Sequence, residues 1–224
     1  MKNVLAITAL MLAAASTQAA TVDWANWTAG GPSGSSSFAV GNIGGIGLSY
    51  TGEIDFTQTN NAGTDYWRDG SSNPFPAYVT GSVSNVPNNV DLVTVTGNHE
   101  GVNTITFSQP VTNPYMAIVS LGQYGIGTTY YFDAPFVVDS VNQGYWGNGT
   151  LVNAGSNWLG GDTLVGNEGH GILQFIGTFN SISFASSNGE HWNGFTLGLA
   201  TPTPASAALL GVAGLSSSIR RRRP

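Results

Sequence analysis

The chain of 224 residues contains no cysteine and very little positive charge. Without cysteine it can form no disulfide, no thiolate nucleophile and no thiolate metal ligand, so its core alone must hold the fold together. Lysine occurs once, at Lys2, and Arg68 is the only Lys or Arg between residues 21 and 200. Lysine-based covalent catalysis is therefore excluded from this body. It also lacks the cationic footprint that binding to nucleic acid requires.

The body is strongly acidic. Its twelve carboxylates against one arginine give a formal charge of −11, whereas Lys2 and four terminal arginines bring the whole chain to −6. Such a body repels an anionic membrane surface, and its acidity favours solubility or divalent cations, such as a structural calcium ion. The chain also lacks a Gly-x-Ser-x-Gly elbow, a phosphate-binding P-loop and a His-Glu-x-x-His zinc motif.

The first 20 residues have the organisation of a secretory signal peptide. Lys2 is followed by an apolar run over residues 4–15 and by small residues around Ala19 and Ala20. This order predicts export and cleavage after Ala19 or Ala20.

Residues 201–224 form a second distinctive segment. A turn at Pro202, Thr203 and Pro204 precedes an apolar run of small residues over 205–215. The basic cluster that follows consists of Arg220, Arg221, Arg222 and Arg223. An apolar run stopped by cations is typical of a membrane stop, although this one is shorter than the roughly 20 residues of a full span.

This tail resembles the sorting segment of the PEP-CTERM family, the substrates of exosortases. The resemblance covers the last 24 residues, with Thr203 in place of glutamate and Pro224 after the arginines. It implies a short membrane helix, transient anchoring in the inner membrane and transfer by an exosortase to the cell surface or extracellular matrix. The alternative is a marginal anchor or a disordered basic tail. Only the tail is expected to contact lipid.

Residues 21–200 are expected to form one all-β domain, a jelly-roll-like antiparallel β-sandwich. Glycines split residues 38–50 into two short strands, and residues 92–96 and 104–107 alternate as a hairpin does. Residues 115–121 are almost continuously apolar, which predicts a central strand. Residues 57–76 and 142–171 are expected to be long loops.

All three histidines lie next to a glutamate in Gly/Asn-rich turns. The residues concerned are His99, Glu100, Glu168, His170, Glu190 and His191. If these turns meet, imidazole and carboxylate groups suit a divalent metal or acid–base chemistry. Ordinary polar turn residues are the alternative, and the spacing matches no metal motif.

The aromatic residues of the two long loops point to carbohydrate. The candidate sugar platform consists of Tyr66, Trp67, Arg68, Asp69, Tyr145, Trp146 and Trp158. Tryptophan offers a flat apolar face on which a sugar ring can stack, and Asp and Asn bind its hydroxyls. The alternatives are that these aromatics anchor the loops in the core and that Arg68 forms a local ion pair with Asp65 or Asp69.

The sequence thus predicts an exported surface or matrix protein that associates with extracellular polysaccharide and needs no cofactor. Two alternatives stay open: a glycan hydrolase or lyase that uses loop carboxylates, and a purely structural matrix protein. Exposed Trp67 and Trp146 grouped together would favour binding, whereas two carboxylates across a cleft would favour catalysis.

Overall fold

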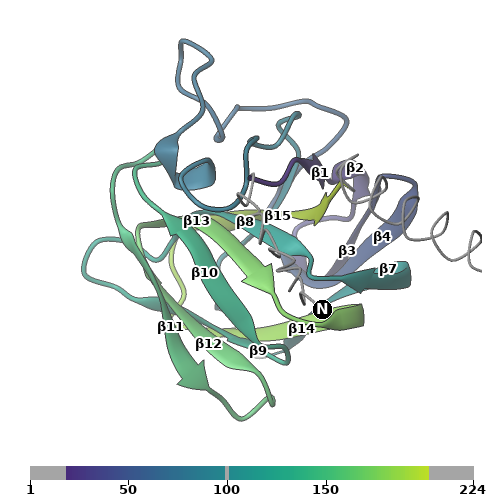
Figure 1. The fold of residues 1–224 in the computed structure, drawn as a ribbon. Coiled ribbons are helices and arrows are strands. Elements are labelled where there is room, and N and C mark those ends of the chain that lie inside the picture. Colours follow the sequence, from purple (N-terminus) through teal and green to yellow (C-terminus); the bar gives the residue numbers. More distant parts are fainter. Residues whose placement is uncertain (1–18, 99–100, 202–224) are drawn as a thin grey trace, which may run out of the picture.

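The computed structural model of the chain describes residues 19–98 and 101–201. The described residues form antiparallel strands and one short 3-10 helix, which confirms the all-β prediction (Figure 1). The first seven strands are β1 (Val22–Trp24), β2 (Asn26–Gly30), β3 (Gly34–Ile43), β4 (Ile46–Ile54), β5 (Thr57–Gln58), β6 (Leu92–Val95) and β7 (Val102–Thr112). The others are β8 (Tyr115–Leu121), β9 (Thr128–Phe132), β10 (Phe136–Val141), β11 (Thr150–Ser156), β12 (Asp162–Asn167), β13 (Gly169–Phe175), β14 (Thr178–Ser187) and β15 (Asn193–Ala200).

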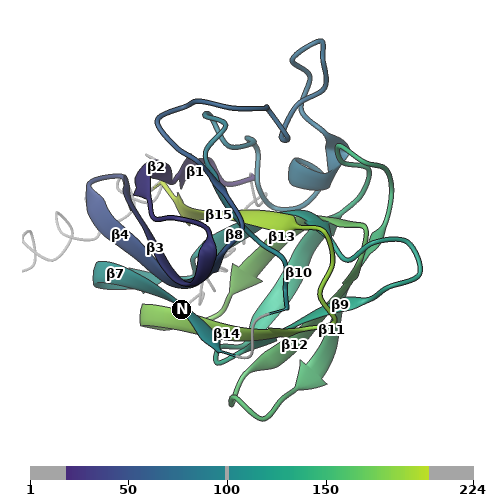
Figure 2. The ribbon, with the colours of Figure 1, turned by 180° about the vertical axis from the view of Figure 1, so that it is seen from behind.

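The strands form two sheets that face each other across the main core (Figures 1 and 2). One has seven strands in the order β10-β13-β8-β15-β6-β5, with β1 beside β15; the other has eight, in the order β11-β12-β9-β14-β7-β4-β3-β2. Large side chains from both sheets fill the space between them, among them Trp27, Tyr50, Phe132, Phe175 and Phe195. Their burial supplies the apolar stabilisation that a body without disulfides needs.

The last eight strands pair in a nested pattern. β8 pairs with β15, β9 with β14, β10 with β13, and β11 with β12, and all four pairings are antiparallel. The pairs alternate between the two sheets. As a result, the connections β8–β9, β10–β11, β12–β13 and β14–β15 all gather at one end of the sandwich.

The central strands of the seven-stranded sheet, β13, β8 and β15, are buried on both faces. The outer face of the sheet is covered by residues 59–91, the blue segment at the top of Figure 1, which include the 3-10 helix η1 (Pro76–Tyr78). All seven residues of β8 are buried: Met116 faces the main core, whereas Ala117 faces a second core beneath the long segment. The predicted central strand is confirmed. Residues 57–76 do not form only a surface loop, because their aromatic side chains belong to this second core.

Two local expectations are wrong. Residues 92–96 and 104–107 do not form a hairpin, because β6 pairs with β15 and β5 in one sheet and β7 pairs with β14 and β4 in the other. Both segments alternate because each is a strand of a sandwich, and alternation does not reveal the partner. Residues 142–171 are not one long loop, because they contain the hairpin of β11 and β12.

The two ends of the described body lie side by side. β1 pairs with β15, and the backbone N–H of Thr201 donates to the Thr21 carbonyl oxygen over 2.9 Å. The apolar run of the signal peptide and most of the sorting tail, from Pro202 onward, lie outside the described residues. Within residues 19–98 and 101–201, no helix combines the length and apolar character of a membrane span.

Candidate functional site

An aromatic cluster stands where the long segment meets the gathered loop end of the sandwich. Tyr66 comes from the segment over the seven-stranded sheet, Tyr145 and Trp146 from the β10–β11 connection, and Trp192 from the β14–β15 connection. The Tyr66 ring stacks on Trp146, with 5.2 Å between centroids and 28° between planes. Trp192 meets Tyr66 at 5.3 Å and Trp146 at 5.0 Å. The cluster therefore joins three segments that are distant in sequence.

Two members of this cluster remain open to solvent. Trp146 is 45% exposed and Tyr145 is 43% exposed, and their centroids lie 4.8 Å apart. Contacts with Tyr66 and Trp192 hold the Trp146 ring in place, so it presents a fixed apolar surface. A fixed aromatic surface of this kind binds a ligand at a smaller entropic cost than a mobile one.

Trp67 does not belong to the exposed platform. It is 0% exposed and packs edge-on against Tyr78, at 5.1 Å between centroids, in the second core. Its indole Nε1 has no hydrogen-bond partner among the described residues. The neighbouring Tyr66 faces the other way, into the cluster. Of the two expectations for Trp67, the structure matches the loop anchor.

The other predicted platform residues have local roles. Arg68 pairs with Asp65 at 3.1 Å and donates to the Pro87 carbonyl oxygen at 2.7 Å. Asp69 accepts the backbone N–H groups of Asn73 and Ser71, which lower the pKa of its carboxyl group. These contacts make Arg68 and Asp69 parts of the loop framework.

Trp158 is separate from the cluster. It is 69% exposed, packs against Tyr131 at 6.2 Å, and belongs to the β11–β12 turn. Trp146 precedes the beginning of β11, whereas Trp158 follows its end, so the two tryptophans lie at opposite ends of the sandwich.

Two of the three His–Glu turns meet beside the aromatic cluster. An open cavity of about 210 Å³ is lined by Ser120, Gln123, Trp146, Glu168, Glu190, His191 and Trp192. A second open cavity of about 380 Å³ is lined by Tyr124, Trp146, Asn148, Gly149, Thr150, Asn167 and Glu168. Both cavities contain Trp146 and Glu168. We call the two cavities together the Trp146 groove.

The metal expectation gains no support from this arrangement. Among residues 19–98 and 101–201, no group of three or more His, Asp or Glu side chains is placed to hold a metal ion. His99 and Glu100 lie outside the described residues. His170 is buried, and its Nδ1 accepts the Ser120 backbone N–H at 3.3 Å instead of facing the groove.

Glu190 lies in the groove with one oxygen tied to the fold. The backbone N–H of Gly122 donates to its Oε1 at 2.5 Å, and the Asn193 amide donates to the same oxygen at 2.9 Å. Burial raises the pKa of Glu190 to about 7, against the effect of these two donors, and the charge of Glu168 acts in the same direction as burial. Glu190 therefore holds a proton over much of the range below neutral pH.

Glu168 is held by a different set of neighbours, Ser120 and His170. Its Oε1 accepts a short hydrogen bond from the Ser120 hydroxyl and lies 3.9 Å from Nε2 of His170. Ser120 has φ 56° and Glu168 has φ 54°, a left-handed backbone that non-glycine residues seldom adopt. A register shift between β8 and β13 lies at this point. Strained residues and bulges of this kind concentrate at functional sites.

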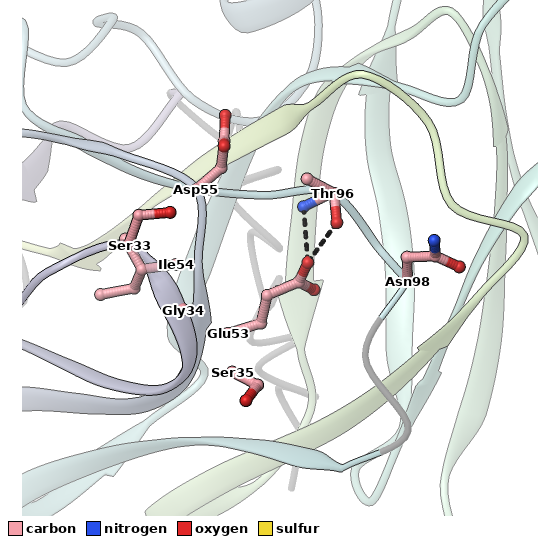
Figure 3. A pocket seen from close by; sticks show the side chains of 8 residues that line it. All are labelled: Ser33, Gly34, Ser35, Glu53, Ile54, Asp55, Thr96 and Asn98. Carbon is pink, nitrogen blue, oxygen red and sulfur yellow. Dashed lines mark hydrogen bonds between the residues drawn. The ribbon is translucent and has the colours of Figure 1, made fainter.

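A third cavity has a different character. It measures about 230 Å³, and Glu53 and Thr96 are among the residues that line it (Figure 3). Glu53 Oε1 accepts the backbone N–H of Thr96 at 3.0 Å and its hydroxyl, and Oε2 accepts the Gly97 N–H at 3.2 Å. Both carboxylate oxygens are thus used to fasten the end of β6. We therefore place the functional site at the Trp146 groove.

The sequence reasoning missed Trp192, Ser120, Gln123 and Tyr124, which all belong to the cluster or the groove. Trp192 could have been noticed, because it directly follows Glu190 and His191. The other three lie at the end of β8 and in its connection to β9, where nothing in the sequence separates a groove wall from an ordinary turn. Comparisons of the chain with protein-family models, with curated proteins and with solved structures found no significant match.

Proposed function

We propose that the protein is an exported β-sandwich of the cell surface or extracellular matrix that binds extracellular polysaccharide in the Trp146 groove. One observation carries the proposal: the part-exposed Trp146 packs against Tyr66, Tyr145, His170 and Trp192 and lines two adjoining cavities that also carry polar side chains. A sugar ring can stack on the indole while its hydroxyls reach polar side chains in either cavity.

The polar lining of the groove suits a chain of hydroxyl groups. Glu168 and Gln123 offer acceptors and donors on one side, and Asn148 and Asn167 do so in the second cavity. Hydrogen bonds from such groups fix the orientation of a sugar ring, which stacking on the indole alone does not fix. Two cavities that share one tryptophan match neighbouring sugar units of a polymer.

The carboxyl groups of the groove disfavour anionic polysaccharides. The groove contains Glu168 and Glu190, and the only arginine of the body, Arg68, is engaged with Asp65 and the Pro87 carbonyl group. A polymer of uronic acids would meet carboxylates with no free arginine or lysine beside them. We therefore propose neutral polysaccharides as the ligand class.

The nested pairing of β8 to β15 supports a finer proposal for the fold, the jelly roll, a class that includes lectin domains. Fold analogy assigns no function by itself, so the groove remains the main argument. Export by the signal peptide and sorting of the tail by an exosortase complete the proposal, and they depend on the sequence alone. No cofactor is part of it.

A retention assay with two tryptophan variants tests the proposal. Trp146→Ala should weaken binding to a neutral polysaccharide, such as mixed-linkage β-glucan, galactomannan or amylose, by about tenfold or more, because loss of one stacking platform costs about 1–3 kcal/mol. Trp158→Ala is the matched control, since Trp158 is also exposed but lies at the other end of the sandwich. Affinity electrophoresis of both variants gives the comparison.

Two outcomes of this assay would contradict the proposal. A wild-type protein that none of these polymers retains, or equal losses in the two variants, would contradict a binding site at Trp146. Polygalacturonate and alginate serve as the anionic comparison and should be retained less well than the neutral polymers.

A further inference from the structure

The smaller cavity of the Trp146 groove holds two carboxyl groups in contrasting surroundings. Glu190 follows β14 and Glu168 precedes β13, yet both line the same cavity, which Trp146 also lines. The fold holds each by different donors: Gly122 and Asn193 for Glu190, and Ser120 for Glu168. Two carboxyl groups with unequal environments can take unequal roles in proton transfer.

Glu190 has the surroundings of a proton donor. Two N–H groups converge on its Oε1, which assigns the proton of the acid form to Oε2. Its pKa of about 7, raised by burial, keeps this acid form populated up to neutral pH. The aromatic wall of Trp146 and Trp192 lies beside it, where a stacked sugar would sit.

Glu168 has the surroundings of a proton acceptor. Its side chain is more open than that of His170 behind it, and its Oε1 already accepts the Ser120 hydroxyl hydrogen bond. The Glu168 side chain lines both cavities. With one sugar unit in each cavity, it would lie near the glycosidic bond between them.

Buried His170 gives an independent indication that Glu168 has a role beyond packing. Because Nδ1 accepts the Ser120 N–H, the proton of the neutral imidazole is on Nε2. Burial lowers the pKa of His170 to about 4, so the ring is neutral at ordinary pH. Nε2 is buried, has no hydrogen-bond partner among the described residues and lies 3.9 Å from Glu168 Oε1. This unpartnered donor points to the carboxylate at the groove wall, and an unsatisfied buried group is costly to keep without a function.

We propose that the Trp146 groove hydrolyses the glycosidic bond of the neutral polysaccharide it binds, with Glu190 as general acid and Glu168 as general base. Glu190 Oε2 gives its proton to the glycosidic oxygen as the bond from that oxygen to the anomeric carbon breaks. A water molecule forms the new bond to the anomeric carbon, and Glu168 takes the proton that this water loses. Glu168 then gives up the proton taken from water and Glu190 regains one through solvent, which restores the starting state, and the products are two shorter glycans. The proposal rests on the binding function argued above.

His170 and Ser120 are positioning residues in this scheme. The Ser120 hydroxyl donates to Glu168 Oε1, and His170 Nε2 lies 3.9 Å from the same oxygen atom. Together the two residues orient the base without contacting the sugar. The left-handed backbone at Ser120 and Glu168 is the structural cost of bringing this base to the groove.

Release of reducing ends from a retained polymer tests the proposal. Wild type, Glu190→Gln and Glu168→Gln are incubated with each neutral polymer that wild type retains, and Asp23→Asn, an exposed carboxylate of β1, is the control. Loss of a general acid or base should lower the rate by about 10²–10⁴-fold, whereas the control should keep the wild-type rate. Thermal melting establishes that each variant is folded, and Glu168→Gln carries the test if Glu190→Gln does not fold.

A second substrate separates the acid from a structural role. An aryl glycoside with an acidic phenol needs little help from a general acid, so Glu190→Gln should regain much of its rate on that substrate and Glu168→Gln should not.

A polymer that is retained but yields no reducing ends would overturn hydrolysis and leave the binding function standing. Hydrolysis at the wild-type rate in both glutamine variants would overturn the assignment of these residues. Absence of retention on every neutral polymer would overturn the binding function itself.

Discussion

Two tryptophans of similar sequence context have opposite surroundings. Trp67 and Trp146 both follow a tyrosine in a polar loop, yet Trp67 is buried under the long segment and Trp146 is part of the groove wall. The difference comes from the surface each loop covers. Residues 59–91 lie over the apolar outer face of β8 and β13, where Trp67 and Tyr78 are buried, whereas the β10–β11 connection follows the end of β10.

Trp67→Ala should therefore destabilise the fold without removing a ligand contact. Loss of a buried large aromatic side chain costs about 3–5 kcal/mol. Trp67→Phe should cost much less, because it keeps most of the packing and removes an Nε1 that has no partner among the described residues. Urea unfolding measures both. A Trp67→Ala variant with wild-type stability and lost polysaccharide retention would contradict the anchor role.

Glu190 in the groove and the buried His170 behind Glu168 change stability with pH in opposite directions. The raised pKa of Glu190 means that the folded protein binds more protons than the unfolded chain from about pH 4.5 to about 7, so its contribution to stability falls as the pH rises through this window. The lowered pKa of His170 has the reverse effect, since its contribution is complete above pH 6.5 and is lost as the pH falls to about 4. The two effects largely cancel where their windows overlap.

Glu190→Gln isolates the first effect. The amide keeps an acceptor for Gly122 and Asn193 but cannot ionise. The stability of the variant relative to wild type should therefore increase as the pH rises. Between pH 5 and pH 8 the difference in unfolding free energy should shift in its favour by about 1–2 kcal/mol, after allowance for partial solvent screening. Urea titrations at the two pH values measure this shift. Equal differences at both pH values would show that Glu190 titrates as an ordinary glutamate.

At the scale of elements, strands with a dense apolar pattern were predictable and strands without one were not. The sequence predicted β8 at its observed bounds, and the split of residues 38–50 into two strands is confirmed by the turn at Gly44 and Gly45, with φ of 55° and 87°. β11 was missed because its residues are mostly small, polar and exposed, so no alternation marks it. β11 lies at the edge of its sheet, where such a composition is tolerated.

The candidate site was predictable only in part. The sequence identified Trp146, Glu168 and Glu190 as candidate site residues, because aromatic residues and His–Glu pairs are unusual in Gly-rich turns. Which of these residues meet depends on the nested pairing that gathers four connections at one end, and strand pairing cannot be read from alternation. That pairing is also what separates Trp158 from Trp146.

At the scale of the whole molecule, both ends of the described body are held by backbone hydrogen bonds close to the predicted processing sites. Ala20 donates its N–H to the Ser82 carbonyl oxygen at 2.7 Å, and its own carbonyl oxygen accepts the Ser84 N–H at 2.9 Å. Cleavage after Ala19 keeps both contacts, whereas cleavage after Ala20 removes them. At the other end, the last contact of the body is that of Thr201 with Thr21.

We therefore expect the mature protein to begin at Ala20 and to end near Pro204. Each missing hydrogen bond at the Ala20 end would cost about 1 kcal/mol. Intact mass spectrometry of the protein from the native cell surface gives both ends in one measurement. A chain that begins at Thr21 should melt at a lower temperature than one that begins at Ala20. A soluble extracellular species that retains Arg220 to Arg223 would contradict sorting by an exosortase, because transfer requires that the tail be cut.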